Sequence, residues 1–384
     1  MNITIWVEPK MYLSNWYHEL ENGFYAALNA KHLKASITPL PHPDLTVKEN
    51  TVIVLVGETY EWYNEMLTFT NQRQLTACVC ACEHPMHSAI TVTSDYTQVA
   101  YNMMQYLYDA GKKSIAFFGV NPSSPHDNMR LESYRQAVHD FHLHCNETDI
   151  YYTKGDINQC ASAFRSQIGK YDAVLCTNDL YAFFALTTAK KAGFRIPENL
   201  FIAGFGNTMI SSISKPTITT ATVNLYNIGY QTIAAIQLMN NNNSLIQLDI
   251  KSDDVYLARE STANIPFSEK YRHHSNVPTS IHQLDGSKNP VTSFNDNTFM
   301  DVVCYEALLK QIDQTDCLII CSIVEKQLNR KSLVAEACFL SDTALDYRLK
   351  RLYKRVNVNS YQAFYQKMIE MANYIDLAKL HSSL

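Results

Sequence analysis

Apolar residues recur with two different spacings along this chain, and the change in spacing divides it into two parts. Up to about residue 263, short apolar runs alternate with longer segments in which apolar residues recur at helical intervals. The short runs indicate buried strands, and the longer segments indicate amphipathic helices. This alternation predicts an α/β fold with mostly parallel sheets that are covered by helices on both faces.

The predicted elements follow one another in a regular order. Strands are predicted at residues 3–7, 35–38, 51–57, 77–82, 114–119, 149–152, 173–177 and 200–205. Helices are predicted at residues 17–30, 61–72, 96–110, 130–141 and 228–239, and residues 10–16 are predicted to form a loop.

The strand at residues 173–177 leads directly into candidate ligand-binding residues. Asn178 follows it and is suited to accept a hydrogen bond from the first free amides of a helix that ends near residue 192. The next strand, at residues 200–205, leads into a turn that contains Asn207. Ligands of open α/β sheets bind at the carboxyl ends of strands, so Asn178 and Asn207 are candidates to contact a small molecule.

Beyond residue 263 the pattern changes. Residues 264–299 lack apolar periodicity and contain Pro, Ser, Asn and Gly, so they are predicted to form a linker. Residues 300–384 are predicted to form an all-α domain, with helices at residues 300–312, 316–328, 331–338, 342–356 and 360–377.

Several segments of the first part resemble one protein family. They are T-N-D at residues 177–179, G-F-R-I-P-E-N at 193–199, I-A-G-F-G-N at 202–207, K-P-T-I-T-T at 215–220 and L-A-R-E-S-T at 257–262. In this order they resemble the effector-binding domain of the LacI/GalR repressor family, and the resemblance covers residues 1–263. It implies a two-lobed, Rossmann-like periplasmic-binding-protein fold, with a first lobe at about 1–93 and 225–250 and a second at about 94–224.

The resemblance also implies ligand-binding residues in a cleft between the two lobes. They are Ser14, Trp16, Ser124, Arg130, Asn178 and Asn207. Judged by residue type alone, Trp16 is as well suited to packing under a loop as to contacting a ligand. Gly206 stands where the family usually has an acidic residue that binds a sugar hydroxyl. The effector is therefore left open between a phosphosugar, a different polyol, a nucleobase and no ligand at all. Asp127 is predicted to be solvated or to cap a helix.

Residues 331–356 have the pattern of a helix, a tight turn and a second helix that Ser341 caps. In the second helix, Leu345, Leu349 and Leu352 form one apolar stripe, which is typical of a recognition helix. The outward residues Thr343, Asp346, Tyr347 and Lys350 are candidates to contact bases, and Lys331, Arg348, Arg351, Lys354 and Arg355 are candidates to contact phosphates. Judged by charge alone, the alternative to DNA contact is that these residues form a basic helix face exposed to solvent. The order of the helices resembles a LuxR-type module, and it also resembles one half of an AraC-type domain.

The charge distribution, the cysteines and the lack of membrane or export signals further restrict the class of protein. The net charge is −5, while the segment from Arg348 to Arg355 is locally basic. A basic segment on an acidic protein favours a polyanion as its partner.

Of the ten cysteines, Cys78, Cys80 and Cys82 are spaced to lie on one strand face, where a buried strand is favoured over a metal site. The sequence has no apolar run typical of a membrane span and no export signal, which predicts a cytoplasmic protein.

Together, these features predict a transcriptional regulator that responds to a sugar-like effector and binds operator DNA as a homodimer through its C-terminal helices. The alternative is a small-molecule-binding protein whose C-terminal helices serve dimerisation or protein interaction. No glycine-rich phosphate loop and no paired nucleophile and base are present, so neither an enzyme activity nor a cofactor is expected.

Overall fold

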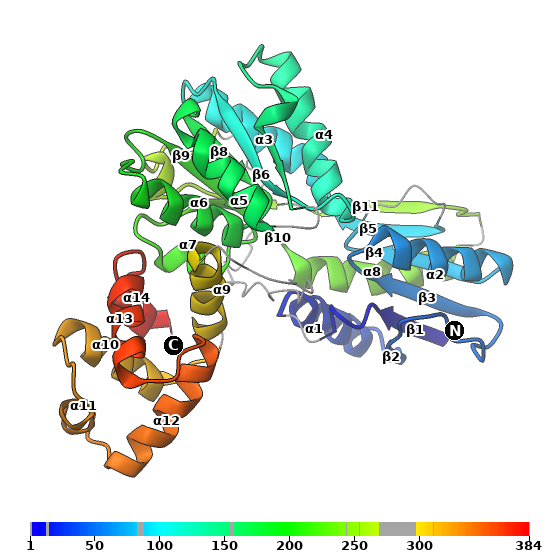
Figure 1. The fold of residues 1–384 in the computed structure, drawn as a ribbon. Coiled ribbons are helices and arrows are strands. Elements are labelled where there is room, and N and C mark those ends of the chain that lie inside the picture. The colour runs from blue at the N-terminus through cyan, green and yellow to red at the C-terminus, as the bar shows by residue number, and fades with distance from the viewer. Residues whose placement is uncertain are drawn as a thin grey trace.

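Among the described residues, the strands form two six-stranded β-sheets, and a group of helices follows them (Figure 1). This computed structural model describes residues 2–12, 15–82, 88–153, 157–242, 244–252, 254–268, 297–309 and 311–383. The parallel strands are short and largely buried, as apolar runs covered on both faces should be.

The first sheet and its helices are here called lobe 1. Its strand order is β11-β5-β4-β3-β1-β2, and all of the neighbouring strands run parallel. The strands are β1 (Asn2–Val7), β2 (Ala35–Pro39), β3 (Thr51–Val56), β4 (Thr76–Cys80), β5 (Ile90–Ser94) and β11 (Leu248–Ser252).

Helices α1 (Asn15–Ala30) and α8 (Leu225–Asn240) cover one face of this sheet, and α2 (Tyr60–Gln72) covers the other. Helices α1 and α8 also lie backbone to backbone. A Cβ atom added at Gly229 would lie 2.1 Å from the carbonyl oxygen of Leu20, and one added at Gly23 would lie 2.1 Å from that of Tyr226. Only glycine therefore permits this approach.

The second sheet and its helices are here called lobe 2. Its strand order is β12-β10-β9-β8-β6-β7, and only the edge strand β12 runs antiparallel to its neighbour. The strands are β6 (Ile115–Val120), β7 (Ile150–Tyr152), β8 (Ala173–Cys176), β9 (Phe201–Phe205), β10 (Thr219–Val223) and β12 (Asp254–Leu257). Helices α3 (Tyr96–Asp109) and α4 (Pro125–Asp140) cover one face, and α5 (Ile157–Gln167) and α6 (Asp179–Lys191) cover the other.

The chain passes between the lobes at Asp95, at Asn224 and between β11 and β12. Asp95 caps α3 by accepting a hydrogen bond from the amide of Gln98, and Asn224 caps α8 in the same way through Asn227. Two of these crossings are therefore fixed by helix N-caps.

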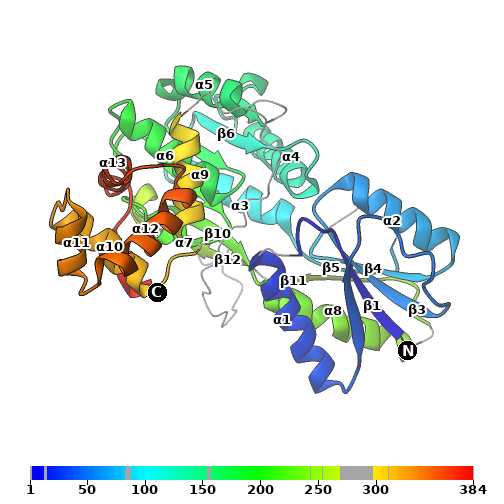
Figure 2. The ribbon, with the colours of Figure 1, turned by 60° about the horizontal axis from the view of Figure 1, so that its bottom comes forward.

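The C-terminal helices pack against lobe 2, as two views of the ribbon show (Figures 1 and 2). They are α9 (Asn297–Leu309), α10 (Gln314–Glu325), α11 (Lys331–Ala337), α12 (Asp342–Arg355), α13 (Tyr361–Met371) and α14 (Leu377–Ser383). Val302 and Leu308 of α9 belong to the same apolar core as Phe183 of α6 and Ile213 of α7 (Met209–Ile213). The C-terminal helices and lobe 2 thus share one core.

Backbone hydrogen bonds also join these two parts. The amide of Lys215 donates to the carbonyl of Tyr374 over 2.7 Å, and the amide of Asp376 donates to the carbonyl of Ile213 over 2.6 Å. An ion pair between Lys191 and Glu370, at 3.0 Å, lies close by. Residues 372–376 are therefore held in a non-helical conformation, and the single helix predicted at residues 360–377 is wrong, since α13 ends at Met371 and α14 begins at Leu377.

The other predicted elements are confirmed apart from four local differences. Helix α4 begins at Pro125 rather than at residue 130, because Ser124 caps it and proline is favoured at its first position. Helix α1 begins at Asn15, within the predicted loop. Four strands, β5, β10, β11 and β12, lie outside the predicted ones. The side chains of β11 and β12 are mostly half-buried or exposed, so these two strands lack an apolar run. Cys82 belongs to a different core cluster from Cys78 and Cys80, because Ala81 has a φ of 59° that breaks the alternation.

Candidate functional site

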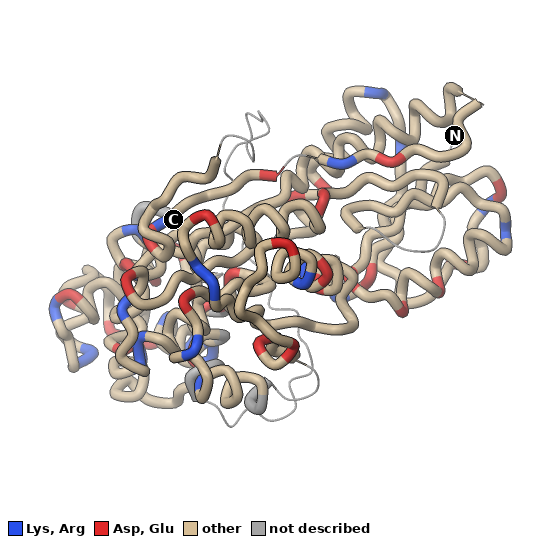
Figure 3. Tube along the Cα trace, turned by 90° about the horizontal axis from the view of Figure 1, so that it is seen from above, with Lys and Arg blue, Asp and Glu red and all other residues tan. Residues whose placement is uncertain are grey.

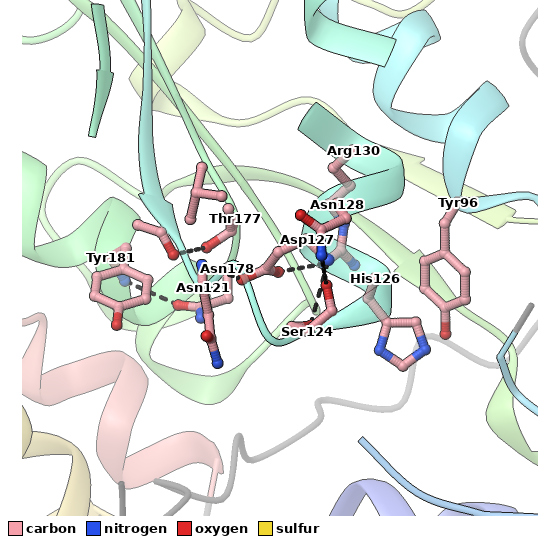
Figure 4. Close-up of polar contacts among 12 residues, drawn as sticks. Tyr96, Asn121, Ser124, His126, Asp127, Asn128, Arg130, Thr177, Asn178 and Tyr181 are labelled. Atoms are coloured by element: carbon pink, nitrogen blue, oxygen red, sulfur yellow. Dashed lines mark hydrogen bonds and ion pairs between the residues drawn. The ribbon is translucent and has the colours of Figure 1, made fainter. Parts of the chain in front are cut away.

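Polar side chains gather at the carboxyl ends of β6 and β8, around the first turns of α4 (Figure 4). Ser124 begins this helix, and its hydroxyl accepts a hydrogen bond from the amide of Asp127 over 3.3 Å. His126, Asp127 and Arg130 follow on the first two turns. Figure 4 shows Thr177 and Tyr181 on one side of these residues and Tyr96 on the other.

Asp127 is a largely buried carboxylate at the centre of this group. It accepts a hydrogen bond from the amide of Asn121 over 2.9 Å and lies 3.4 Å from Arg130. Burial raises the pKa of Asp127 to about 6, although Arg130 and the Asn121 amide lower it in part. The prediction that Asp127 is a solvated or capping residue is therefore wrong, because its side chain is enclosed beside the arginine.

His126 connects the two lobes. Its Nε2 lies 2.9 Å from the carbonyl oxygen of Ala81, which follows β4 in lobe 1. Because a carbonyl oxygen only accepts hydrogen bonds, Nε2 is the donor. The hydroxyl of Tyr96 donates to the same carbonyl over 3.2 Å. Burial, reinforced by the positive charge of Arg130, lowers the pKa of His126 to about 4. The imidazole is therefore neutral near pH 7.

Arg130 lies between two aromatic rings, with its guanidinium carbon 4.6 Å from the ring centre of Phe205 and 5.3 Å from that of Tyr96. Its side chain is only 13% exposed, and among the described residues its Nε has no hydrogen-bond partner. A guanidinium held by two rings is positioned to donate to a hydroxyl or anionic oxygen.

The carboxyl end of β8 is held by short hydrogen bonds. Thr177 donates to the carbonyl of Gly119 over 2.8 Å, and Asn178 caps α6 by accepting from the amide of Tyr181 over 3.0 Å. The capping role predicted for Asn178 is confirmed. Gly119 has a φ of 94°, and a Cβ atom there would lie 2.4 Å from the Tyr181 ring, so this position requires glycine.

Lobe 1 contributes charged residues near the end of β1. The carboxylate of Glu8 accepts hydrogen bonds from the amides of Glu58 and Thr59, over 2.7 and 3.1 Å. Lys10 lies 3.4 Å from Glu8 and 3.2 Å from Glu58. The charge of Glu58 contributes to raising the pKa of Asp127 in lobe 2, so charged groups of the two lobes influence one another.

The remaining predicted ligand-binding residues occupy different surroundings. Ser14 lies outside the described residues. Trp16 is in the first turn of α1 and packs, partly buried, against the core of lobe 1. The side chain of Asn207 is buried, and its Oδ1 accepts a hydrogen bond from Arg259 over 2.5 Å. This bond gives Asn207 a structural role that the sequence did not indicate.

The C-terminal helices include the predicted helix–turn–helix. The hydroxyl of Ser341 caps α12 over 3.2 Å, and Leu345, Leu349 and Leu352 are buried as predicted. Phe339, in the turn, has a φ of 54° and is 95% exposed. The outward residues Thr343, Tyr347, Lys350 and Lys354 are exposed.

Three arginines of α12 make intramolecular ion pairs. Asp316 of α10 is fully buried and lies 2.7 Å from Arg348, 3.3 Å from Arg351 and 3.6 Å from Arg355. Asp313 also pairs with Arg348, at 2.8 Å. Figure 3 accordingly shows acidic and basic positions mixed in this region. These arginines were predicted to contact phosphates, but their charges are largely compensated within the chain.

Lys331 and Asp346 also pair with one another, at 2.6 Å across the helix–turn–helix. Both side chains remain nearly half exposed. Lys350 and Lys354 are thus the exposed lysines of α12 that form no ion pair with any described residue. They are the strongest candidates on this helix for contact with a polyanion.

Comparison with known proteins agrees with the two-lobed architecture. A family model described as a periplasmic binding protein-like domain matches residues 104–262. The structure of a complex of the transcriptional regulator CelR with cellobiose aligns with a TM-score of 0.58 at 15% identity, over 68% of this chain and 84% of that one. The two-lobed region has the periplasmic-binding-protein-like fold. A LacI-family transcriptional regulator from Mycobacterium smegmatis shares it, with a TM-score of 0.55 at 19% identity, over 68% and 99% of the two chains.

Curated relatives of this periplasmic-binding-protein-like region are regulators by name. The NTD biosynthesis operon regulator NtdR of Bacillus subtilis is 31% identical over 190 residues, which are 48% of this chain and 58% of that protein. The transcriptional repressor CytR of Escherichia coli is 31% identical over 164 residues, or 41% and 48% of the two chains. The chain thus spans about half the length of these relatives. The matched family region ends before the C-terminal helices, so it gives no support to a LuxR-type assignment.

The described residues form neither a membrane span nor a cluster of metal ligands. Their helices include none that is long and apolar enough to cross a membrane. They include no group of three or more His, Cys, Asp or Glu side chains arranged to hold a metal ion.

Opposite pH effects are expected from His126 and Asp127. In a His126→Gln variant, the raised pKa of Asp127 remains, so the contribution of Asp127 to the free energy of unfolding should fall as the pH rises from about 4 to 6. In an Asp127→Asn variant, the lowered pKa of His126 remains, so the contribution of His126 should rise between about pH 4 and 6.5. Urea unfolding at several pH values measures both slopes, and parallel slopes in the two variants would contradict these environments.

Proposed function

We propose that this protein is a transcriptional regulator that binds a small molecule between lobes 1 and 2 and duplex DNA through α11 and α12. The single observation that carries the proposal is the shared core of lobe 2 and the C-terminal helices, because it joins a ligand-binding fold directly to a helix–turn–helix. Relatives that are regulators by name support the same function for the first part.

Arg130 is proposed to hold the effector, with His126 and Asn178 beside it. The side chains in this site donate and accept hydrogen bonds, and the rings of Tyr96 and Phe205 provide apolar surface. Such a mixture suits a polyol, a sugar or a sugar phosphate. Bringing the lobes together around the effector would change the position of the C-terminal helices relative to lobe 1, which is a route by which binding alters DNA affinity.

On the DNA, Lys350 and Lys354 are proposed to contact phosphates, while Thr343 and Tyr347 face the bases from the N-terminal half of α12. The placement follows from their exposure opposite the buried leucine stripe. Helices α10 to α13 form a compact four-helix group around this motif, and the LuxR-type assignment of that group stays a prediction. A homodimer on two half-sites is proposed because one such motif contacts only a few base pairs.

One observation favours the alternative in which the C-terminal helices bind another protein. Asp316 and Asp313 compensate the charges of Arg348, Arg351 and Arg355, which reduces the electrostatic attraction of α12 for DNA. If this alternative holds, the exposed Phe339 and Tyr347 would be part of the protein-binding surface.

A charge-reversal experiment separates the two functions. The full chain is first used to select duplexes from a random-sequence pool. A Lys350→Glu, Lys354→Glu variant is then expected to bind the selected duplex at least about tenfold more weakly, with a shallower salt dependence. A Lys34→Glu, Lys48→Glu variant, which changes the net charge equally on exposed residues of lobe 1, is the control. Failure to enrich any duplex, or equal losses in both variants, would contradict DNA binding by α12.

A further inference from the structure

Lobe 1 has a cavity of about 390 Å³ at the start of its first strands, here called the β1–β2 pocket. This volume is within the range of small-molecule sites. The lining includes Thr4 and Trp6 of β1, Lys34 and Ser36 around the start of β2, and Asp44 and Lys48 of the loop that follows β2. The start of β1, which Figure 1 marks with N, lies at the end of lobe 1 that is directed away from lobe 2. The pocket is therefore separate from the candidate effector site, which lies at the carboxyl ends of strands.

The floor of the β1–β2 pocket is polar where a parallel sheet is ordinarily apolar. Alternate residues of β1 pack toward α1 and α8, whereas Thr4 and Trp6 lie on the other side of the sheet, with α2. Thr4 pairs in register with Ser36 of β2, and their hydroxyl oxygens lie 3.0 Å apart. Parallel strands covered on both faces normally carry apolar side chains on both. Here two neighbouring strands present hydroxyl groups instead.

The loop between β2 and β3 forms a wall of the pocket and is fixed at several points. The indole of Trp62 in α2 donates a hydrogen bond to the carbonyl of Leu40 over 2.9 Å. The amide of Leu40 donates to the carbonyl of Val7 over 3.0 Å, and Val47 packs, partly buried, against the core under α2. These contacts lie within lobe 1, so little of the wall has to be ordered when a ligand binds.

The charged residues of the pocket are available to a ligand. Lys34 and Lys48 are exposed, and neither forms an ion pair with a described residue. Oδ1 of Asp44 accepts hydrogen bonds from the hydroxyl and the amide of Thr46, over 2.7 and 2.8 Å. These two bonds lower the pKa of Asp44, so its carboxylate is ionised near pH 7.

Two lysines, one carboxylate and several hydroxyls fit one class of ligand. A phosphomonoester carries roughly two negative charges near pH 7, which two ammonium groups can balance. Asp44 would repel free phosphate, but it can accept a hydrogen bond from a sugar hydroxyl. The hydroxyls of Thr4 and Ser36 both donate and accept. The set therefore suits a sugar phosphate better than inorganic phosphate or an unphosphorylated sugar.

We propose that the β1–β2 pocket is a second small-molecule site of this protein and that it binds a sugar phosphate. The phosphate lies between Lys34 and Lys48, and the sugar hydroxyls face Asp44, Thr4 and Ser36. The proposal rests neither on DNA binding nor on the effector site at Arg130. A chain with both sites binds two small molecules at once, one in each.

Calorimetric titration of the full chain with glucose 6-phosphate and with ribose 5-phosphate tests this pocket. The unaltered chain is expected to bind at least one of them, and to bind glucose and inorganic phosphate at least about tenfold more weakly. A Lys34→Glu, Lys48→Glu variant is expected to lose at least about tenfold in affinity, because charge-assisted hydrogen bonds to the phosphate are lost. An Arg130→Ala variant should keep this binding, since Arg130 belongs to the other site.

A Lys170→Glu, Arg195→Glu variant is the control for net charge, because both residues are exposed on lobe 2, and it should bind as the unaltered chain does. If circular dichroism shows that the Lys34→Glu, Lys48→Glu chain is not folded, Lys34→Gln, Lys48→Gln measures the same loss.

Three results would overturn the pocket. They are no binding of either sugar phosphate by the unaltered chain, equal losses in the lobe 2 control, and binding that Arg130→Ala abolishes while the lysine variant keeps it. The last result would place the sugar phosphate between the lobes and leave the proposed function intact. Enrichment of a duplex by the same chains reports the DNA-binding function separately.

Discussion

Replacing Asp316 with alanine is expected to lower the free energy of unfolding of the C-terminal helices by about 3 kcal/mol. The carboxylate is fully buried and is surrounded by Arg348, Arg351 and Arg355, whose side chains are between 16% and 39% exposed. Removing it leaves Arg351 and Arg355 without this carboxylate, while Arg348 keeps only its ion pair with Asp313. Because those cations reach water in part, the lower end of the range for buried pairs applies. Urea unfolding followed by far-ultraviolet circular dichroism measures the loss.

Asp346 provides the matched control for this change. It also pairs with a basic residue of the same region, Lys331, but both side chains are nearly half exposed. Exposed ion pairs contribute little, so Asp346→Ala should cost less than about 1 kcal/mol. Equal losses for the two variants would show that burial of Asp316 does not decide the stability of the cluster.

Replacing Gly229 with alanine is expected to destabilise lobe 1 by about 3 kcal/mol, the upper end of the usual cost of overpacking. The new Cβ atom would lie 2.1 Å from the carbonyl oxygen of Leu20 and 3.1 Å from the amide nitrogen of Phe24. Both contacts are with backbone, which cannot rotate away as a side chain can. Helices α1 and α8 would have to separate, and their packing on the sheet would loosen. The shift in thermal unfolding midpoint reports the effect.

A Gly169→Ala variant controls for the effect that replacing any glycine with alanine has on stability. A Cβ atom there would meet only the Phe194 ring, at an ordinary contact distance of 3.6 Å. Gly169→Ala should therefore leave the unfolding midpoint nearly unchanged. A Gly229→Ala variant as stable as Gly169→Ala would contradict the close approach of the two helices.

Local signals in the sequence were sufficient to predict most of the fold. The cap at Asn178 and the turn at Gly193 define α6 through short-range chemistry, and the structure places the helix between them. The break between α13 and α14 could not be predicted in this way. Tyr374 and Ile375 continue the apolar pattern of a helix, but their backbone pairs with residues 213–215, which are distant in sequence. Tertiary contacts decide that conformation.

The candidate site was only partly predictable for a similar reason. Arg130 was identified from its resemblance to a known motif, but the rings that hold it, Tyr96 and Phe205, lie far from it in the sequence. His126 and Asp127 follow directly after the cap at Ser124 and the proline, and this local pattern could have marked them as the start of a helix that faces the site. The charge cluster around Asp316 gave no such signal, because its members come from two helices.

The shared core of lobe 2 and the C-terminal helices has a consequence for how the chain can be divided. If the protein were cut before α9, apolar side chains such as Phe183 and Ile213, which now lie in that core, would lose the cover of α9 and α14. The remaining fragment would expose an apolar surface patch and would be less soluble than the full chain. Proteolysis at this boundary would therefore yield an aggregating fragment rather than a free-standing receptor domain.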